Sequence, residues 1–134
     1  MKIDHIALWT SDLERSLSFY TEFFGAEHGE KYINPVKQLE TYFLQFDGSA
    51  RLELMRKPLL VSSSNDNASC GWVHVAFEVG SIDEVDRKAR DLKSAAYLTE
   101  EPRWTGDGYY EAVALDPDGN RIEIVSRELR RSRA

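Results

Sequence analysis

The sequence predicts an α+β protein built from two consecutive βαβββ modules, residues 1–57 and 72–127. Three short segments of the first half recur in the second half, in the same order and at an offset of 69 or 70 residues. Self-similarity at one fixed offset is the signature of repeated structural units. The matching segments are Asp4 to Leu8 with Val73 to Phe77, Ser11 to Glu14 with Ser81 to Glu84, and Leu52 to Leu54 with Ile122 to Ile124.

The first module contains the signals of one strand, one helix and three further strands. The apolar, β-rich run from Ile3 to Trp9 predicts a strand. Ser11 and Glu14 have the spacing of a capping box, which predicts that a helix opens at Ser11. Gly25 predicts the end of that helix, because a helix C-terminus favours a residue that can adopt positive φ. Strand-like runs follow at 26–33, 39–46 and 51–56.

The second module repeats this order. A strand is expected from Trp72 to Val79, a helix from Ser81, and strands at 97–100, 109–115 and 121–125. The polar segment 58–71 between the modules is typical of a surface linker. We expect one domain over 1–127, because neither half alone could cover both faces of its sheet. Residues 128–134 are expected to form a flexible tail.

Composition narrows the class of protein. Of the 134 residues, 42% are hydrophobic and 30% charged, as in ordinary globular proteins. No apolar run approaches the roughly 20 residues that a membrane-spanning helix needs. The net charge of −6 argues against nucleic acid or an anionic membrane as a partner. The single cysteine, Cys70, cannot form an internal disulfide, which fits the cytoplasm. We therefore expect a cytoplasmic protein that binds neither nucleic acid nor a membrane.

Two histidines and two glutamates occupy equivalent places in the repeats: His5 with His74, and Glu53 with Glu123. Each is flanked by apolar residues within a predicted strand. Because alternate residues of a strand face opposite sides of its sheet, all four project away from the apolar, helix-covered face. If the two sheets curve toward each other, the four side chains line a shared cavity.

These four side chains suit a divalent metal ion. Taken singly, a histidine or glutamate on a strand is more often an exposed or hydrogen-bonded residue, but their equivalence in both modules favours a shared role. Carboxylates in a cavity are costly unless they are paired or bound to metal. Two imidazoles and two carboxylates leave an octahedral ion two open positions for substrate oxygens. His28 and Cys70 have no counterpart in the repeat, and we expect no chemical role for them.

Several motifs together resemble a known family, over nearly the whole chain from Ile3 to about Ser126. This family is the vicinal-oxygen-chelate superfamily, which includes glyoxalase I and the bleomycin-resistance proteins. The turn Asp-Pro-Asp-Gly that leads into the last glutamate strand is its most specific signal here. The motifs are His5-Ile6-Ala7, Asp12 to Ser16, Phe19-Tyr20, Leu52-Glu53-Leu54, His74 to Phe77 and Asp116 to Glu123.

The resemblance is closest to the glyoxalase I (lactoylglutathione lyase) branch. It implies that His5, Glu53, His74 and Glu123 bind one nickel, cobalt or zinc ion. It also implies a lyase or isomerase that acts on the hemithioacetal of a 2-oxoaldehyde and a thiol. Glu123, with Glu53 as its counterpart, would move a proton between adjacent carbons. Members of the superfamily often form homodimers, and in some the first-module ligands of one chain meet the second-module ligands of its partner.

One position departs from the glyoxalase I pattern. Trp9 stands where those enzymes commonly carry an arginine that grips the carboxylate of glutathione, so the resemblance leaves the thiol open. Arg51, Arg56 or Lys57 could supply a cation instead, although each also fits an ordinary solvated charge. Two alternative functions stay open: a methylmalonyl-CoA epimerase-like isomerase, and a protein that binds a drug or metabolite without turnover.

Overall fold

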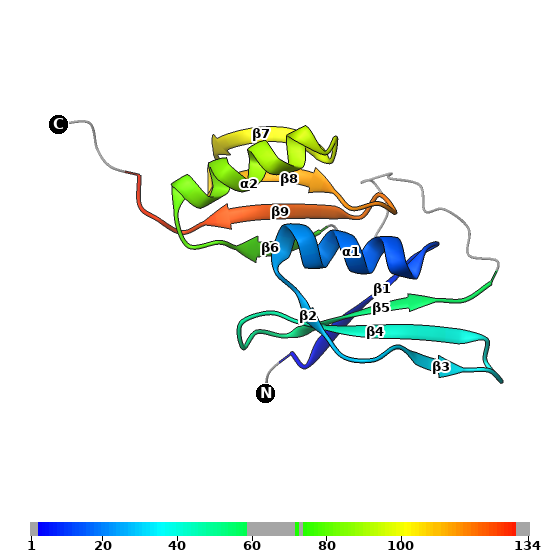
Figure 1. Cartoon of the computed structure of the whole chain (residues 1–134). Helices are drawn as coiled ribbons and strands as arrows, with labels where there is room; N and C mark the ends of the chain where they lie inside the picture. Colours follow the sequence, from blue (N-terminus) through cyan, green and yellow to red (C-terminus); the bar gives the residue numbers. More distant parts are fainter. Residues whose placement is uncertain (1–2, 59–71, 73, 131–134) are drawn as a thin grey trace. The chain divides into compact units, whose positions relative to one another are not determined.

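The computed structural model describes residues 3–58, 72 and 74–130, and the chain divides into two compact units, 1–64 and 65–134 (Figure 1). Nearly all of the expected linker, with Cys70, lies outside the described residues, as do residues 131–134 of the expected tail. The single domain expected over 1–127 stays a prediction.

Unit 1 contains a mixed sheet and one helix. The first strand, β1, runs parallel to β5, and the other pairings are antiparallel. The strand order is β1-β5-β4-β2, and β3 also pairs with β4. The elements are β1 (His5–Trp9), α1 (Leu13–Phe24), β2 (Glu27–His28), β3 (Tyr32–Asn34), β4 (Leu39–Gln45) and β5 (Arg51–Arg56).

Unit 2 has the same arrangement. Its strand order is β6-β9-β8-β7, and the first strand again lies parallel to the last. The βαβββ order predicted for both modules is therefore confirmed. The elements are β6 (Val75–Glu78), α2 (Ile82–Ser94), β7 (Leu98–Trp104), β8 (Tyr110–Leu115) and β9 (Arg121–Ser126).

One expected strand of unit 1 is interrupted. The run predicted at 26–33 forms two short strands, β2 and β3, which pair with different parts of β4. Gly29 follows β2 directly, and glycine weakens a strand interior because it has no side chain to pack.

The helix ends are set by particular residues, and one differs from the prediction. Asp12, not Ser11, caps α1: its carboxylate accepts the Arg15 amide at 3.0 Å, the third amide after the cap. Ser11 accepts a bond from the Arg15 guanidinium instead. The Ser81 cap of α2 is confirmed, as is the helix end at Gly25, where φ is +65°.

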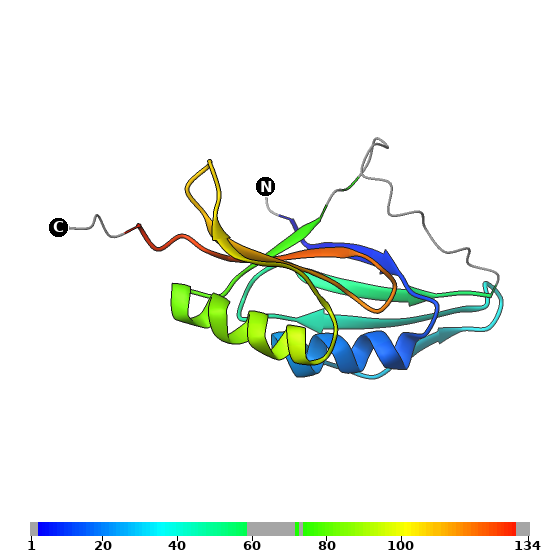
Figure 2. The same cartoon turned by 90° about the horizontal axis from the view of Figure 1, so that it is seen from above.

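Each helix covers one face of the sheet in its own unit. Helix α1 packs on β4 and β5, whereas α2 packs on β7, β8 and β9 (Figure 2). Leu52 and Leu54 are buried on this side in unit 1, and Ile122 and Ile124 in unit 2. The intervening glutamates therefore project from the opposite side, which we call the helix-free face of each unit. Neither α1 nor α2, the helices of the described residues, is long and apolar enough to span a bilayer.

Candidate metal centre

In unit 1 the structure brings His5 and Glu53 together on the helix-free face. Nε2 of His5 lies 3.8 Å from a carboxylate oxygen of Glu53. The parallel register of β1 and β5 places Ala7 beside Glu53, and its small side chain leaves room for the imidazole two residues earlier. Only 13% of the Glu53 side chain is exposed, against 41% of the His5 side chain.

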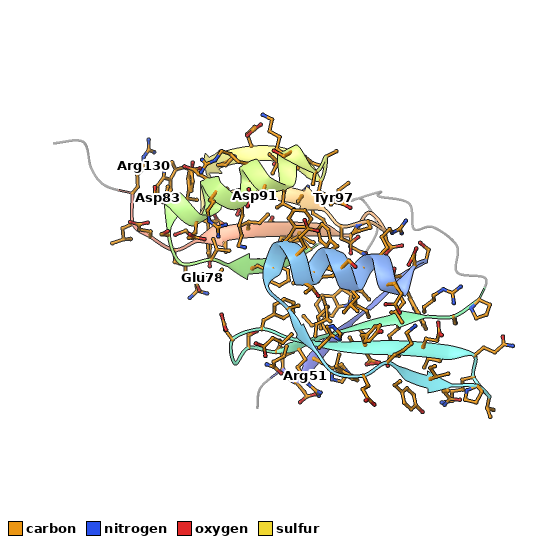
Figure 3. All side chains as sticks on the ribbon, viewed as in Figure 1. Arg51, Glu78, Asp83, Asp91, Tyr97 and Arg130 are labelled. Atoms are coloured by element: carbon orange, nitrogen blue, oxygen red, sulfur yellow. The ribbon has the colours of Figure 1, made fainter. Side chains whose placement is uncertain are left out.

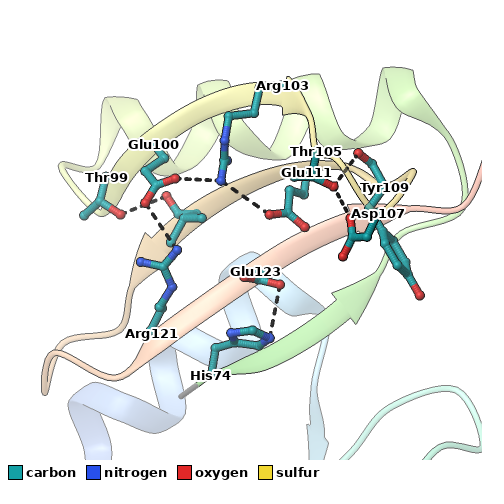
Figure 4. Close-up of polar contacts among 11 residues, drawn as sticks. His74, Thr99, Glu100, Arg103, Thr105, Asp107, Tyr109, Glu111, Arg121 and Glu123 are labelled. Atoms are coloured by element: carbon teal, nitrogen blue, oxygen red, sulfur yellow. Dashed lines mark hydrogen bonds and ion pairs between the residues drawn. The ribbon is translucent and has the colours of Figure 1, made fainter. Parts of the chain in front are cut away.

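Unit 2 contains the equivalent pair. Nε2 of His74 lies 3.2 Å from a carboxylate oxygen of Glu123 (Figure 4). Ala76 stands beside Glu123 across the parallel β6–β9 ladder, in the place that Ala7 has in unit 1. The Glu123 side chain is again 13% exposed. The same small residue beside the same acidic residue explains why both strand pairs present a histidine and a glutamate together.

His5 has three further neighbours that sequence reasoning did not place beside it. Its Nδ1 lies 2.8 Å from the Asp4 carboxylate, which also accepts a 2.9 Å bond from Arg51. The Phe43 ring meets the imidazole edge-on, with centroids 5.4 Å apart. The hydrogen bond to His5 and the Arg51 guanidinium lower the pKa of Asp4. The parallel register that pairs His5 with Arg51 would have placed Arg51 beside this histidine, but the sequence alone does not give the register.

In unit 2, charged residues of β7, β8 and β9 form a network of ion pairs near Glu123 (Figure 4). Glu111 is buried on the helix-free face, two residues from the cross-strand partner of Glu123. Burial, together with the negative charge of Glu123, raises the pKa of Glu111. Arg103 bridges Glu111 at 3.5 Å and Glu100 at 2.8 Å. Strand alternation along β8 could have located Glu111, since it shares a face with Val113.

The donor atoms of both pairs fit a divalent ion. Imidazole nitrogen and carboxylate oxygen are suitable ligands for nickel, cobalt and zinc. Two donors that share an ion at bonds of about 2.1 Å lie roughly 3.0–3.5 Å apart. The 3.2 Å pair falls within this range, and the 3.8 Å pair lies slightly above it. Among the described residues no three His, Cys, Asp or Glu side chains form such a group. Each unit supplies two donors, and the four-ligand site stays a prediction.

The region around Trp9 shows which cations accompany it. The Trp9 side chain is exposed, and the Lys57 ammonium lies 4.8 Å from its ring centroid. Arg51 and Arg56 are each paired with a carboxylate. Of the three cations considered from the sequence, Lys57 is the one with its charge over the tryptophan ring.

The chain belongs to the Glyoxalase/Bleomycin resistance protein/Dioxygenase superfamily, whose family model matches residues 2–124. This membership confirms the family expected from the motifs, and with it the fold class.

Individual relatives fit the same family. A lactoylglutathione lyase of Schizosaccharomyces pombe is 26% identical over 94% of this chain and 47% of its own length. The mitochondrial methylmalonyl-CoA epimerase of Bos taurus is 29% identical over 72% of this chain and 60% of its own. The structure of the trypanothione-dependent glyoxalase I of Leishmania major superimposes with a TM-score of 0.76 at 27% identity, covering 95% of this chain and 87% of that one. The chain spans about half the length of the lactoylglutathione lyases that it matches.

Proposed function

We propose that this protein is a metal-dependent enzyme of the glyoxalase I type. It isomerises the hemithioacetal of a 2-oxoaldehyde and a thiol to a thioester. The observation that supports this most is the repeat-equivalent pairing of a histidine with a glutamate in both units, at 3.8 and 3.2 Å. We propose that His5, Glu53, His74 and Glu123 hold one nickel, cobalt or zinc ion. Such an ion supplies Lewis-acid polarisation of adjacent substrate oxygens.

The proton transfer is assigned to the glutamates. In this proposal Glu123 accepts the proton when the C–H bond of the hemithioacetal carbon breaks, and returns it to the neighbouring carbon. The hydroxyl proton of the first carbon passes to the oxygen of the former ketone. The first carbon is thereby oxidised to the thioester level and the former ketone carbon is reduced to an alcohol, so no external redox partner is needed. His74 Nε2 and the Glu123 carboxylate lie 3.2 Å apart, a spacing that suits two ligands of one ion. Glu53 is the counterpart of Glu123 in unit 1.

The thiol specificity is expected to differ from that of a glutathione-specific enzyme. Trp9 offers an exposed apolar ring with the Lys57 ammonium over it, rather than the fork of an arginine. The relative from Leishmania major is described as trypanothione-dependent, so thiols other than glutathione serve within this fold. An assay should therefore include several low-molecular-weight thiols.

We also propose that residues 1–127 act as one domain in a cytoplasmic homodimer. Light scattering coupled to gel filtration tests the assembly: a mass near twice the 15.4 kDa of the chain is expected. A monomeric mass at assay concentrations would refute the dimer.

Metal analysis and turnover test the enzyme proposal together. The purified protein should bind a divalent ion through the four ligands and convert methylglyoxal plus a thiol to a thioester. A chelator should remove the activity, and added Ni²⁺, Co²⁺ or Zn²⁺ should restore it. His28→Ala is the matched control, because this histidine lies outside both pairs, and it should retain metal and activity. Less than a tenth of an equivalent of metal, with no uptake on titration, would overturn the proposal.

The similarity to methylmalonyl-CoA epimerase favours a second candidate. An epimerase would use the same proton abstraction beside a carbonyl, but on an acyl-CoA. Exchange of the α-proton of an acyl-CoA with D₂O, without thioester formation from any hemithioacetal, would support this alternative. A binding protein without turnover is less consistent with two intact histidine–glutamate pairs.

A further inference from the structure

The residues around His5 are linked to the histidine and to one another by contacts on the helix-free face of unit 1. Asp4 accepts from Nδ1 of His5 at 2.8 Å and from the Arg51 guanidinium at 2.9 Å. The Asp4 carbonyl also accepts the Arg51 amide at 3.0 Å, so backbone and side chain are held by the same residue. The guanidinium of Arg51, labelled in Figure 3, stacks 4.5 Å from the centroid of Phe43. Phe43 in turn meets the His5 ring.

We propose that Asp4, held in place by Arg51, is a positioning residue that fixes the tautomer and orientation of His5. A neutral imidazole carries one proton, so an acceptor at Nδ1 keeps that proton there and leaves the lone pair on Nε2. Nε2 is the nitrogen that faces Glu53. A carboxylate behind a histidine in this way orients the ring as a metal ligand. The inference rests on the proposed function, since it assigns Nε2 to the metal.

Stability alone gives a weak reason for this arrangement. The Asp4 side chain is 69% exposed, and exposed ion pairs contribute little to folding. The contacts nevertheless converge on one ring: a carboxylate at Nδ1, an aromatic edge beside it, and a guanidinium that joins the two. Such a set restricts the rotation of the imidazole, which matters to a ligand more than to an ordinary surface residue.

The chain contains its own control. The residue equivalent to Asp4 in the second repeat is Val73, whose side chain has no hydrogen-bond acceptor. The aspartate therefore distinguishes His5 from His74, although both face a glutamate through Nε2. Any change at position 4 should alter His5 and leave His74 as it was.

The first test reads the tautomer in the full-length, metal-free protein. With ¹⁵N-labelled histidine at mildly alkaline pH, long-range ¹H–¹⁵N correlations should show Nδ1–H as the main form of His5. Asp4→Ala should shift the tautomer ratio several-fold toward Nε2–H, whereas Asp4→Asn, which keeps a neutral acceptor, should give an intermediate ratio. The His74 signals should not move. An unchanged His5 ratio in a folded Asp4→Ala variant would overturn the proposal.

The second test measures metal affinity by competition with a chromophoric chelator for Zn²⁺. Asp4→Ala should weaken binding by about 10-fold, the lower end of the effect of such outer groups. Glu22→Ala removes the same charge from the exposed side of α1 and should leave affinity unchanged. Equal affinity for Asp4→Ala and wild type would refute the positioning role while leaving the enzyme proposal intact. Absence of Zn²⁺ binding by the wild type would instead refute the proposed function, and the tautomer test would still decide the role of Asp4.

Discussion

The two units share one architecture but surround their histidine–glutamate pairs differently. In unit 1 the polar neighbours gather about the histidine, where Asp4 and Arg51 hold His5. In unit 2 they gather about the glutamate. The buried Glu111 lies near Glu123, and Arg103 forms an ion pair with Glu111. The donors thus lie at equivalent places on the two sheets, whereas the residues around them differ between the units.

If the proposed function holds, this difference favours a division of tasks between the two pairs. A histidine locked by a carboxylate suits a fixed ligand, because its orientation cannot follow the substrate. A glutamate in a charged network, with a second carboxylate nearby, suits a group that exchanges a proton. We therefore propose that the unit 1 pair mainly retains the metal and that Glu123 transfers the proton.

Replacing each glutamate in turn should separate the two tasks. Glu123→Gln removes the proposed base while keeping the shape of the side chain, so kcat should fall by about 10²- to 10⁴-fold. Glu53→Gln should mainly weaken metal binding, and saturating metal should recover much of its turnover. Initial rates at several metal concentrations, with circular dichroism as the check on folding, distinguish the variants. Wild-type turnover in Glu123→Gln would refute the assignment.

The face on which each proposed ligand lies could be predicted, because it follows from strand alternation. Leu52 and Leu54 had to face the helix, so Glu53 had to face away, and the burial of both leucines bears this out. The exact helix start depended on finer geometry. Ser11 and Asp12 can both cap a helix, and it is Asp12 that has the extended backbone of an N-cap and accepts the Arg15 amide.

Contacts between strands that are distant in sequence lay beyond such reasoning. The Asp4–Arg51 bond joins residues 47 positions apart, and it follows from the parallel register of β1 and β5. Alternation along one strand assigns Asp4 to the side opposite His5, yet its side chain turns back to Nδ1 just before β1 begins. The alternation of residues along a strand predicts which face of the sheet each one occupies. The register between strands and the course of the chain at their ends determine which residues become neighbours.

Core truncations test whether the units fold together, as a single domain requires. Leu54 and Ile124 are equivalent in the repeat and almost fully buried. Alanine at either position should lower the free energy of unfolding by about 2–5 kcal/mol. Differential scanning calorimetry should show one transition that moves down in both variants. Two transitions, of which Leu54→Ala lowers only one, would show that the units unfold independently and would contradict the single domain.

The helix caps provide a smaller comparison between the units. Asp12→Ala and Ser81→Ala each remove an acceptor for the amide three residues on, and each should cost about 1 kcal/mol of stability in urea unfolding. Ser11→Ala is the matched control, and a change below about 0.5 kcal/mol is expected. A larger loss in Ser11→Ala than in Asp12→Ala would return the cap to Ser11.

The smallest expected effect concerns Glu111, for which unit 1 has the neutral Thr41 at the offset of 70 residues. Because folding raises the pKa of Glu111, its carboxylate lowers stability once it ionises, and this cost vanishes as the pH falls below its unfolded pKa. Glu111→Gln should therefore raise the thermal midpoint at pH 8, by less than about 4 °C, and leave it nearly unchanged at pH 4.

Arg103→Met should act in the opposite direction at pH 8, since it removes the cation that offsets the carboxylate of Glu111. If both variants lowered the midpoint equally at pH 8, the Arg103–Glu111 pair would be a net stabilising contact. The buried Glu111 carboxylate near Glu123 would then not lower the stability of the protein, and no functional reason would be needed to explain its presence.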